Sequence, residues 1–237
     1  IMFDLFKITL VKDDSILLID KLAGWTSFDV VAKIRGAIRH SYMSKGVKPT
    51  KRQLKVGHAG TLDPFATGLL IVLLGDATKK ADEFLKLDKV YEATITLGAT
   101  SSTGDPEGEI TPVSSEVPTK ETIEAALKQF VGEIQQRPPA FSAIKVNGQR
   151  AYKLARKGQD VEIPLRTVTI YSIELLEYAY PEVKIRTHVG SGTYIRSLAV
   201  DIGEKLGTGA YCSQLRRTAI TGYDLKEAKG IDFYANI

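Results

Sequence analysis

The sequence feature that most constrains the fold of this chain is an uninterrupted apolar run, LLIVLL, at Leu69–Leu74. A short continuous apolar run bounded by turn residues is typical of a strand that is buried on both faces, because a half-exposed strand would alternate apolar and polar residues. We therefore predict a strand here that is buried on both faces. Such a strand would tie the residues in front of it firmly to the core.

Those preceding residues form a glycine-rich loop, and the stretch Val56–Leu70 reads VGHAGTLDPFATGLL. Its glycines allow tight turns and a close approach of the backbone to a ligand. Asp63 stands directly before Pro64, and a residue before proline is pushed toward an extended conformation. A carboxylate presented by a rigid loop at a strand end is common at catalytic sites. An Asp-Pro pair can also serve only to cap a turn, so both interpretations stay open at this point.

The rest of the chain mixes helical and strand patterns without regular alternation. Strands are expected at 16–20, 89–98, 166–178, 183–189 and 210–218. The first expected helix begins at Thr26 or Ser27, and another runs from about Thr119 to a stop at Gly132. Further helices are expected at 77–87, 151–157 and 195–206. Asn147-Gly148 between two short extended runs predicts a hairpin. The sequence therefore predicts an α+β fold with a mixed, mostly antiparallel central sheet flanked by helices.

Length and composition limit the class of protein. The 237 residues, 43% of them hydrophobic, suffice for one sizeable domain. The single cysteine, Cys212, cannot form an intrachain disulfide, which fits a reducing compartment. The N-terminal stretch does not read as a signal peptide, and no apolar run approaches the roughly 20 residues that cross a bilayer. We expect a cytoplasmic protein.

Positive charge is concentrated between the first predicted helix and the glycine-rich loop. The net charge is only +4, which mildly favours an anionic partner. The basic residues of this segment are Lys45, Lys48, Lys51, Arg52 and Lys55. They can form a solvated loop or contact a phosphate backbone, and the sequence favours neither interpretation strongly.

Several familiar catalytic sites are not encoded. The chain has no phosphate-binding P-loop, no dinucleotide fingerprint and no Gly-x-Ser-x-Gly elbow. Its histidines, His40, His58 and His188, lack the spacing of a metal site. What remains is one well-placed aspartate amid much positive charge, which suits covalent or electrostatic catalysis by a carboxylate on an anionic substrate, with neither metal nor cofactor.

Two further residues are candidates for such a site. Tyr91 ends an inward-facing row of the strand predicted at 89–98, where a tyrosine either belongs to the core or forms the wall of a pocket. Arg196 lies in the first turn of the helix predicted over 195–206. A helix N-terminus favours acidic groups, so this arginine is expected to serve another partner.

Four blocks follow one another along the chain: GHAGTLDPFATGLL, KVYEATITLG, GTYIRSL and LRRTAITGY. In this order and spacing they closely resemble the TruB family of tRNA pseudouridine synthases. The resemblance runs from about Ile16 to about Tyr223. It implies that the chain isomerises uridine 55 in the T loop of tRNA, without a cofactor and with the target base flipped out. The substrate implied is the T arm of tRNA, with no metal, no membrane and no obligate protein partner, and we expect a monomer.

The same resemblance assigns roles to individual residues. Asp63 matches the family's catalytic aspartate, and His58 matches the histidine that helps to extract the uridine. Tyr91 matches the tyrosine that stacks on the target base. An ionised Asp63 could attack C1′ or C6 of the nucleotide, or remove a sugar proton to give a glycal, and the order of steps stays open.

Other family motifs add residues around this centre. Tyr194 and Arg196 match the second pocket motif, and Leu215 matches an apolar pocket residue. Lys21 and Lys79 fall in flanking lysine-bearing motifs. We expect Arg196 to act in catalysis by pairing with the catalytic carboxylate and keeping its pKa low.

The chain departs from the family pattern in two places. It has Lys21-Leu22-Ala23-Gly24 where the family commonly has Lys-Pro-x-Gly, which affects the rigidity of that turn. It also ends at Ile237, so we expect a single catalytic domain in which the additional C-terminal RNA-binding domain of many members is absent or a remnant. RNA would then be held by the segment 45–55 and by an insertion at about 137–157, which carries Lys145 and Arg150.

Alternative functions remain to be weighed. An RNA-guided synthase that modifies ribosomal RNA shares the aspartate loop, and a non-catalytic module that binds or folds tRNA would need only the basic surfaces. A nucleoside glycosidase would ordinarily need two carboxylates.

Overall fold

The computed structural model describes residues 15–142, 144–146, 148–155 and 163–235. The chain forms two compact units, one built from the residues up to Leu87 together with those from Arg216 on, the other from Asp88–Leu215. The boundary falls within a single strand, β12 (Ala210–Ile220). The predicted single catalytic domain concerns both units together and stays a prediction.

The first unit is organised around the strand predicted from the apolar run, β3. The strands of this unit, besides the end of β12, are β1 (Ile16–Lys21), β2 (Val56–Ala59), β3 (Thr67–Leu74), β13 (Tyr223–Asp224) and β14 (Lys229–Gly230). The helices are α1 (Ser27–Ser44), the 3-10 turn η1 (Gly75–Lys80), α2 (Ala81–Leu85), the 3-10 turn η2 (Leu225–Glu227) and α6 (Ile231–Ala235).

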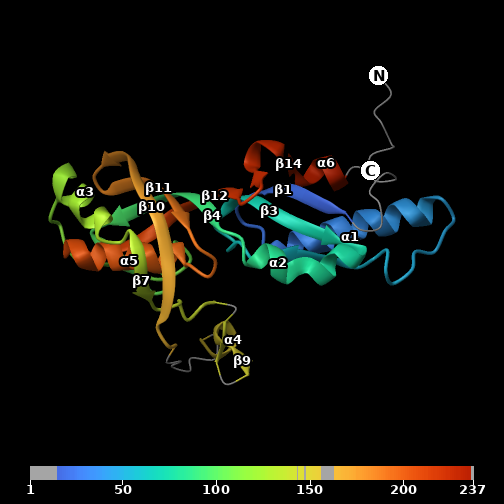
Figure 1. Ribbon diagram of the computed structural model, residues 1–237, viewed down its shortest axis with the longest axis horizontal. Helices are drawn as coiled ribbons and strands as arrows, with labels where there is room; N and C mark the ends of the chain where they lie inside the picture. Colours follow the sequence, from blue (N-terminus) through green and yellow to red (C-terminus); the bar gives the residue numbers. More distant parts are fainter. Residues whose placement is uncertain (1–14, 143, 147, 156–162, 236–237) are drawn as a thin grey trace. The chain divides into compact units, whose positions relative to one another are not determined.

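β3 is buried on both faces, as predicted, and it has neighbouring strands on both edges. β1 pairs antiparallel along one edge of β3. Along the other edge, β12 pairs in parallel with Thr67 and Gly68, and β2 pairs antiparallel with Ile71–Leu74. Figure 1 shows β1 and β3 running side by side. The side chains of Leu69–Leu73 have no exposed surface. Leu69, Ile71 and Leu73 pack with Ala59 and Phe84 in one core cluster, which burial of apolar surface stabilises.

Local signals account for the helix boundaries in this unit. Thr26 caps α1 by a reciprocal arrangement in which its hydroxyl accepts from the Asp29 N–H and the Asp29 carboxylate accepts from the Thr26 N–H, so the predicted start is confirmed. The helix predicted at 77–87 is wrong in its bounds. The chain first makes the tighter turn η1, in which the Thr78 hydroxyl donates to Gly75 O at 2.7 Å, and only Ala81–Leu85 is α-helical.

The second unit is an antiparallel sheet covered by helices. Its strands, besides the start of β12, are β4 (Lys89–Leu97), β5 (Ala99–Ser101), β6 (Ile110–Pro112), β7 (Gly132–Gln136), β8 (Lys145–Val146), β9 (Gln149–Arg150), β10 (Arg166–Ala179) and β11 (Glu182–Val189). The helices are α3 (Lys120–Lys128), α4 (Ala151–Ala155) and α5 (Ile195–Leu206). In the sheet, β4, β11, β10 and β7 are consecutive neighbours. α3 packs against α5 and β10, as Figure 1 shows, and α5 contacts β4.

Most of the patterns predicted for this unit are confirmed. Tyr91, Ala93, Ile95 and Leu97 form the buried row of β4. The predicted strands β10 and β11 pair with each other antiparallel, and β8 pairs with β9 across Gly148 in the predicted hairpin. Asn147 and the predicted end of α4 at residues 156–158 lie outside the described residues.

Gly132 does not stop the preceding helix, contrary to prediction. α3 ends at Lys128, and tight turn bonds from Phe130 N to Leu127 O and from Val131 N to Lys128 O follow it. Gly132, with φ of 113°, instead begins β7. The positive φ that suits glycine is therefore used to enter a strand.

These observations confirm the α+β class with a mostly antiparallel sheet, since the pairs β1–β3, β2–β3, β4–β11, β10–β11, β7–β10 and β12–β13 are antiparallel, whereas β1–β14 and β3–β12 are parallel. No helix within residues 15–142, 144–146, 148–155 or 163–235 combines the length and apolar content needed to span a bilayer.

Candidate active site

Asp63 lies in the first unit, on the connection between β2 and β3. Its side chain is half-buried, and its backbone carbonyl accepts from Ala66 N at 3.1 Å, closing a turn around Pro64 and Phe65. We refer to residues 60–67 as the Asp63 loop. This loop begins at Gly60, whose φ of 96° favours glycine.

Both neighbours of Asp63 in the chain are held by groups from the end of β1, the turn that follows it and the start of α1. The Ser27 hydroxyl accepts from Leu62 N at 2.8 Å and donates to Leu62 O at 3.1 Å, and all three groups are buried. Pro64 O accepts from Gly24 N at 2.9 Å and from Lys21 Nζ at 3.2 Å. The carboxylate of Asp63 is thus mounted between two fixed points, which is the preorganisation that catalysis requires.

Lys21 serves this framework from inside the protein. Its side chain is 1% exposed, and besides Pro64 O its ammonium donates to Leu22 O at 2.9 Å and to Trp25 O at 2.7 Å. A buried ammonium needs such acceptors to offset the loss of water. The bonds also hold the turn in which this chain lacks the family's proline. A direct contact between Lys21 and substrate stays a prediction.

His58 lies on β2, two residues before the loop, and its environment favours the neutral imidazole. Burial, and then the nearby charge of Arg217, lower the pKa of His58 below its usual 6.5. Its Nδ1 atom is buried and makes no hydrogen bond to any residue that the structure describes.

Arg216 and Arg217, at the end of β12, complete the surroundings of the loop. Arg217 Nε donates to Leu69 O at 2.7 Å and Nη2 donates to Gly60 O at 3.0 Å. Arg216 pairs with Asp20 and also bonds Thr67. Neither arginine was predicted from the sequence to belong to the site, although both stand in the LRRTAITGY block.

In the second unit, Arg196 pairs with Asp105. Its position at a helix N-terminus predicted that it serves a partner other than the helix dipole. Its Nη1 forms a 2.9 Å ion pair with Asp105, and both side chains are 4% exposed. The guanidinium also donates to Thr103 O at 3.0 Å and to Phe141 O at 2.9 Å. The role of Asp105 as a buried counter-ion was not predicted from the sequence, because 91 residues separate the pair.

Tyr194 precedes Arg196 and is positioned by a buried amide. Gln136 Oε1 accepts from Tyr194 N at 2.8 Å, and Gln136 Nε2 donates to Tyr194 O at 3.1 Å. Tyr91 is 9% exposed near the start of β4, opposite Thr187 of β11. Leu215 is 8% exposed on β12. The burial of Tyr91 and Leu215 fits a core position as well as a pocket wall, so their role in binding the base stays a prediction.

The residues predicted to contact an RNA backbone are mostly exposed. Lys45, Lys48, Lys51, Arg52 and Lys55 are exposed in the first unit, as is Arg150 in the second. Asp76 forms 2.9 Å ion pairs with Arg52 and with Lys79. The hydrogen bond from Lys79, followed by the charges of neighbouring basic residues, lowers the pKa of Asp76.

The predicted site residues therefore fall into two groups. Asp63, His58, Lys21 and Lys79 belong to the first unit. Tyr91, Tyr194, Arg196, Leu215, Lys145 and Arg150 belong to the second. The predicted pairing of Asp63 with Arg196 joins residues of different units, and it stays a prediction.

Two family models match consecutive parts of the chain. The family model described as "TruB family pseudouridylate synthase (N terminal domain)" matches residues 47–195, and the model described as "tRNA pseudouridylate synthase B C-terminal domain" matches residues 196–233. The chain belongs to the TruB family. It is therefore a pseudouridine synthase, as the four sequence blocks predicted.

Relatives within the TruB family match almost end to end. The chain is 48% identical to tRNA pseudouridine synthase B of Phocaeicola vulgatus over 224 residues, which is 94% of this chain and 92% of the relative. It is 51% identical to the protein of the same name from Bacteroides fragilis over 217 residues, 91% of this chain and 90% of the relative.

Solved structures of TruB-like proteins have the same fold. A Cbf5–Nop10–Gar1 complex contains a chain that matches with a TM-score of 0.66 at 33% identity, covering 92% of this chain and 51% of that one. An H/ACA ribonucleoprotein bound to a substrate RNA containing 2′-deoxyuridine gives a TM-score of 0.67 at 30% identity, covering 96% and 55%. The chain thus spans about half the length of these two structural relatives.

Proposed function

We propose that this protein isomerises uridine 55 in the T loop of tRNA to pseudouridine, with Asp63 as the catalytic carboxylate and the target base flipped out of the loop. The observation that carries the proposal is the mounting of Asp63 between Leu62 and Pro64, each held by buried side-chain or backbone donors. The name of the relatives at 48% and 51% identity, tRNA pseudouridine synthase B, supports tRNA as substrate.

The reaction matches what a single carboxylate offers. The C1′–N1 bond breaks, the uracil turns, and a C1′–C5 bond forms; C5 loses a proton and N1 gains one, so the product is an isomer of the substrate. No oxidant, reductant or energy source is consumed. An ionised Asp63 serves each of three routes, namely attack on C1′, attack on C6, or removal of a sugar proton.

The target base must leave the stack before Asp63 can reach it, which costs a few kcal/mol. His58 and Tyr91 are the groups proposed to offset this cost, the first by entering the opened loop and the second by stacking on the extruded uracil. A neutral His58 suits insertion into an RNA loop, because it needs less desolvation than an imidazolium. Its lowered pKa supports that form.

Arg196 contributes a charge that is already oriented. The buried pair with Asp105 and the bonds to Thr103 O and Phe141 O hold its guanidinium in place. We propose that this guanidinium keeps Asp63 ionised once RNA has displaced water, which is the predicted Asp63–Arg196 interaction. Tyr194 and Leu215 would line the same pocket.

RNA is proposed to be held by the exposed basic residues, the segment 45–55 and the insertion that carries Lys145 and Arg150. Each lysine or arginine that neutralises a phosphate releases counterions, so affinity should fall steeply with salt. The protein is proposed to act in the cytoplasm, as a monomer that needs no protein partner.

The RNA-guided alternative has support from the fold, since the matching solved chains come from a Cbf5–Nop10–Gar1 complex and from an H/ACA ribonucleoprotein. Those chains are 30% to 33% identical to this one, against 48% and 51% for the proteins named tRNA pseudouridine synthase B. The higher identity favours the stand-alone tRNA enzyme.

The test uses the purified protein alone with an unmodified tRNA transcript, followed by mapping of pseudouridine. We expect a single T-loop uridine to be converted by the wild type, no detectable conversion by Asp63→Asn, and wild-type conversion by Asp82→Asn. Asp82 is an exposed aspartate of α2 in the same unit, so its variant controls for the loss of one negative charge. Undiminished activity of Asp63→Asn would contradict the mechanism, and conversion only with an added guide RNA would favour the alternative.

A further inference from the structure

Two consecutive arginines at the end of β12 reach opposite parts of the Asp63 loop. In the parallel pairing of β12 with β3, Arg216 lies opposite Thr67 and Arg217 opposite Gly68. Successive residues of a strand point to opposite faces. The two side chains can therefore contact different groups around one short stretch of β3.

The close approach of the two strands depends on Gly68. A Cβ atom at this position would lie 2.3 Å from Arg217 O and 2.8 Å from Arg217 N, and the φ of Gly68 is 98°. Both facts restrict the position to glycine. The backbone of Arg217 thus touches the end of the Asp63 loop, and its side chain starts from a fixed point.

Arg217 closes the loop at its base. Its side chain is only 1% exposed, yet it carries a full charge. Nη2 donates to Gly60 O, where the loop begins, and Nε donates to Leu69 O, just after it ends. Burying a guanidinium is costly unless it is well hydrogen-bonded, and an apolar side chain would fill the space without joining the two carbonyls.

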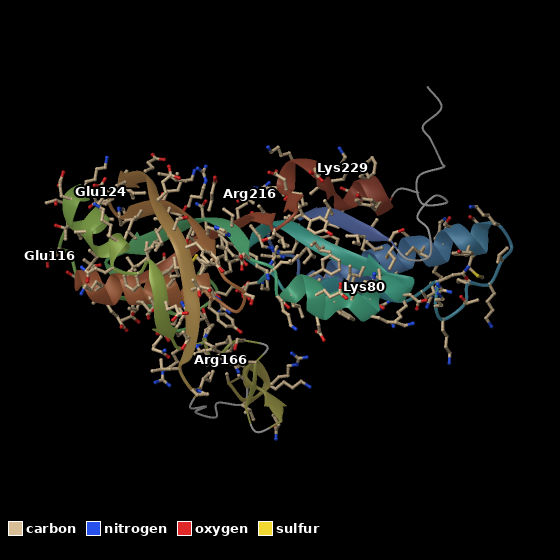
Figure 2. The ribbon with its side chains drawn as sticks, in the orientation of Figure 1. Lys80, Glu116, Glu124, Arg166, Arg216 and Lys229 are labelled. Atoms are coloured by element: carbon tan, nitrogen blue, oxygen red, sulfur yellow. The ribbon has the colours of Figure 1, made fainter. Side chains whose placement is uncertain are left out.

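Arg216 holds the outgoing end by a different contact. Its Nη1 donates to the Thr67 hydroxyl at 3.2 Å, and its Nη2 pairs with Asp20 Oδ2 at 2.8 Å. The other carboxylate oxygen of Asp20 is buried without a hydrogen bond to the described residues. Asp20 precedes Lys21, which holds Pro64, so the ion pair connects two anchors of the same loop. Figure 2 labels Arg216.

We propose that Arg216 and Arg217 are positioning residues that hold the two ends of the Asp63 loop and thereby direct the Asp63 carboxylate. The inference rests on the proposed catalytic role of Asp63. Misplacement of a reacting group by about 1 Å can cost roughly 100-fold in rate. Loss of these contacts should therefore slow the chemical step at saturating RNA while leaving RNA affinity nearly unchanged.

Arg216 has a competing interpretation that the test must separate. Its side chain is 42% exposed, so it could bind an RNA phosphate directly. Arg216→Gln would then raise KM and reduce the salt dependence of binding by about one phosphate contact. Asp20→Asn breaks the same ion pair but keeps the charge of Arg216. If Arg216 positions the loop, both variants should lose kcat to a similar extent with KM nearly unchanged. If Arg216 binds RNA, only Arg216→Gln should raise KM.

The experiment measures kcat and KM for unmodified tRNA with Arg217→Lys, Arg216→Gln and Asp20→Asn, after circular dichroism has established that each variant is folded. Lysine keeps the charge of Arg217 but cannot bridge both carbonyls. We expect kcat to fall about tenfold or more for Arg217→Lys and about threefold to tenfold for the other two, with KM within about twofold.

Arg35→Lys is the matched control, because Arg35 also donates to two backbone carbonyls, Leu54 O at 3.2 Å and Val56 O at 3.0 Å, outside the Asp63 loop. Its kcat should stay within about twofold of the wild type. An equal loss of kcat in Arg35→Lys would overturn the proposal, since the effect would then be general loosening of the unit.

Unchanged kcat in Arg217→Lys would also overturn the proposal. If that variant does not fold, the half-exposed pair decides the matter: matching losses of kcat in Arg216→Gln and Asp20→Asn support positioning, and unchanged kcat in both overturns it. Asp63→Asn, measured in parallel, separates the two proposals. An active Asp63→Asn contradicts the proposed function, whereas an inactive one beside unimpaired arginine variants contradicts only the positioning role.

Discussion

The Asp63 loop and the basic segment 45–55 belong to the same unit but are built in opposite ways. The carbonyls of Gly60, Leu62 and Pro64 in the loop accept hydrogen bonds from the buried side chains of Arg217, Ser27 and Lys21. The basic segment instead carries exposed charges, and Arg52 forms an ion pair whose members are 54% and 38% exposed. Chemistry needs atoms fixed to within a fraction of an ångström, whereas attraction to a phosphate backbone needs charge in roughly the right region.

This comparison predicts that substitutions in the buried framework change stability and kcat, whereas substitutions in the exposed basic segment change affinity and its dependence on salt. Four measurements would sharpen it or break it.

The largest effect is expected from Asp105→Asn, which extends the comparison to the second unit. Removing one partner of a buried ion pair leaves the other charge uncompensated, and this typically costs about 3–5 kcal/mol. Urea unfolding should show that loss of stability, and steady-state kinetics with unmodified tRNA should show a large fall in kcat. Glu174→Gln is the control, because Glu174 pairs with Arg186 at the surface, with side chains 62% and 48% exposed, and should cost less than about 1 kcal/mol. Similar losses in both would refute the distinction between buried and exposed pairs.

Ser27→Ala should have the next largest effect. It leaves both the N–H and the carbonyl of Leu62 buried without their partner, at a cost of about 1–3 kcal/mol, and it frees the residue next to Asp63. We expect kcat to fall about tenfold with KM nearly unchanged. Ser44→Ala, which removes an exposed hydroxyl bonded to Ser41 O, should change neither quantity. A selective rise in KM for Ser27→Ala would contradict a positioning role.

Charge reversal in the basic segment should affect binding alone. The triple variant Lys48→Glu, Lys51→Glu, Arg52→Glu should weaken tRNA binding by about tenfold or more and reduce the slope of log K against log salt by about 2 to 3. Filter binding at several salt concentrations measures both. Lys86→Glu with Lys226→Glu and Lys229→Glu, all three exposed in the same unit, makes the same change of net charge outside the basic segment. Unaltered affinity and slope in the triple variant would mean that the RNA is held elsewhere.

The smallest effect concerns pH. Because burial lowers the pKa of His58 below 6.5, the unfolded chain takes up a proton at a higher pH than the folded one. Stability should therefore decline as pH falls below about 6.5, and His58→Gln should flatten that decline.

Asp201 of α5 acts in the opposite sense, since burial raises its pKa from 3.8 to about 6. Its contribution to stability is present at low pH and is lost as pH rises from about 3.8 through about 6, so Asp201→Asn should remove that loss.

Much of the framework around Asp63 could be predicted from local sequence. The apolar run identified β3, and the glycines and Pro64 identified a rigid loop in front of it. The position of Arg196 at a helix N-terminus correctly indicated that it serves another partner, because the helix dipole disfavours a cation there. These inferences needed only a few neighbouring residues.

Contacts between distant residues could not be predicted. Nothing in the sequence connects Arg196 with Asp105, Ser27 with Leu62, or Arg217 with Gly60. Arg217 was missed because arginine is rarely fully buried, so a basic residue near a strand end suggests a surface position. Gly132 was misread for a related reason, since a glycine after a helical pattern can either end the helix or enter the next strand.

By itself, therefore, the sequence determined the fold class, the TruB-like blocks and Asp63 as the catalytic candidate, because periodicity, proline and glycine act over a few residues. Only the tertiary structure decided which buried donors hold the Asp63 loop and which carboxylate balances Arg196. Buried polar groups must find partners once water is excluded, and those partners become neighbours only when the strands and helices have packed.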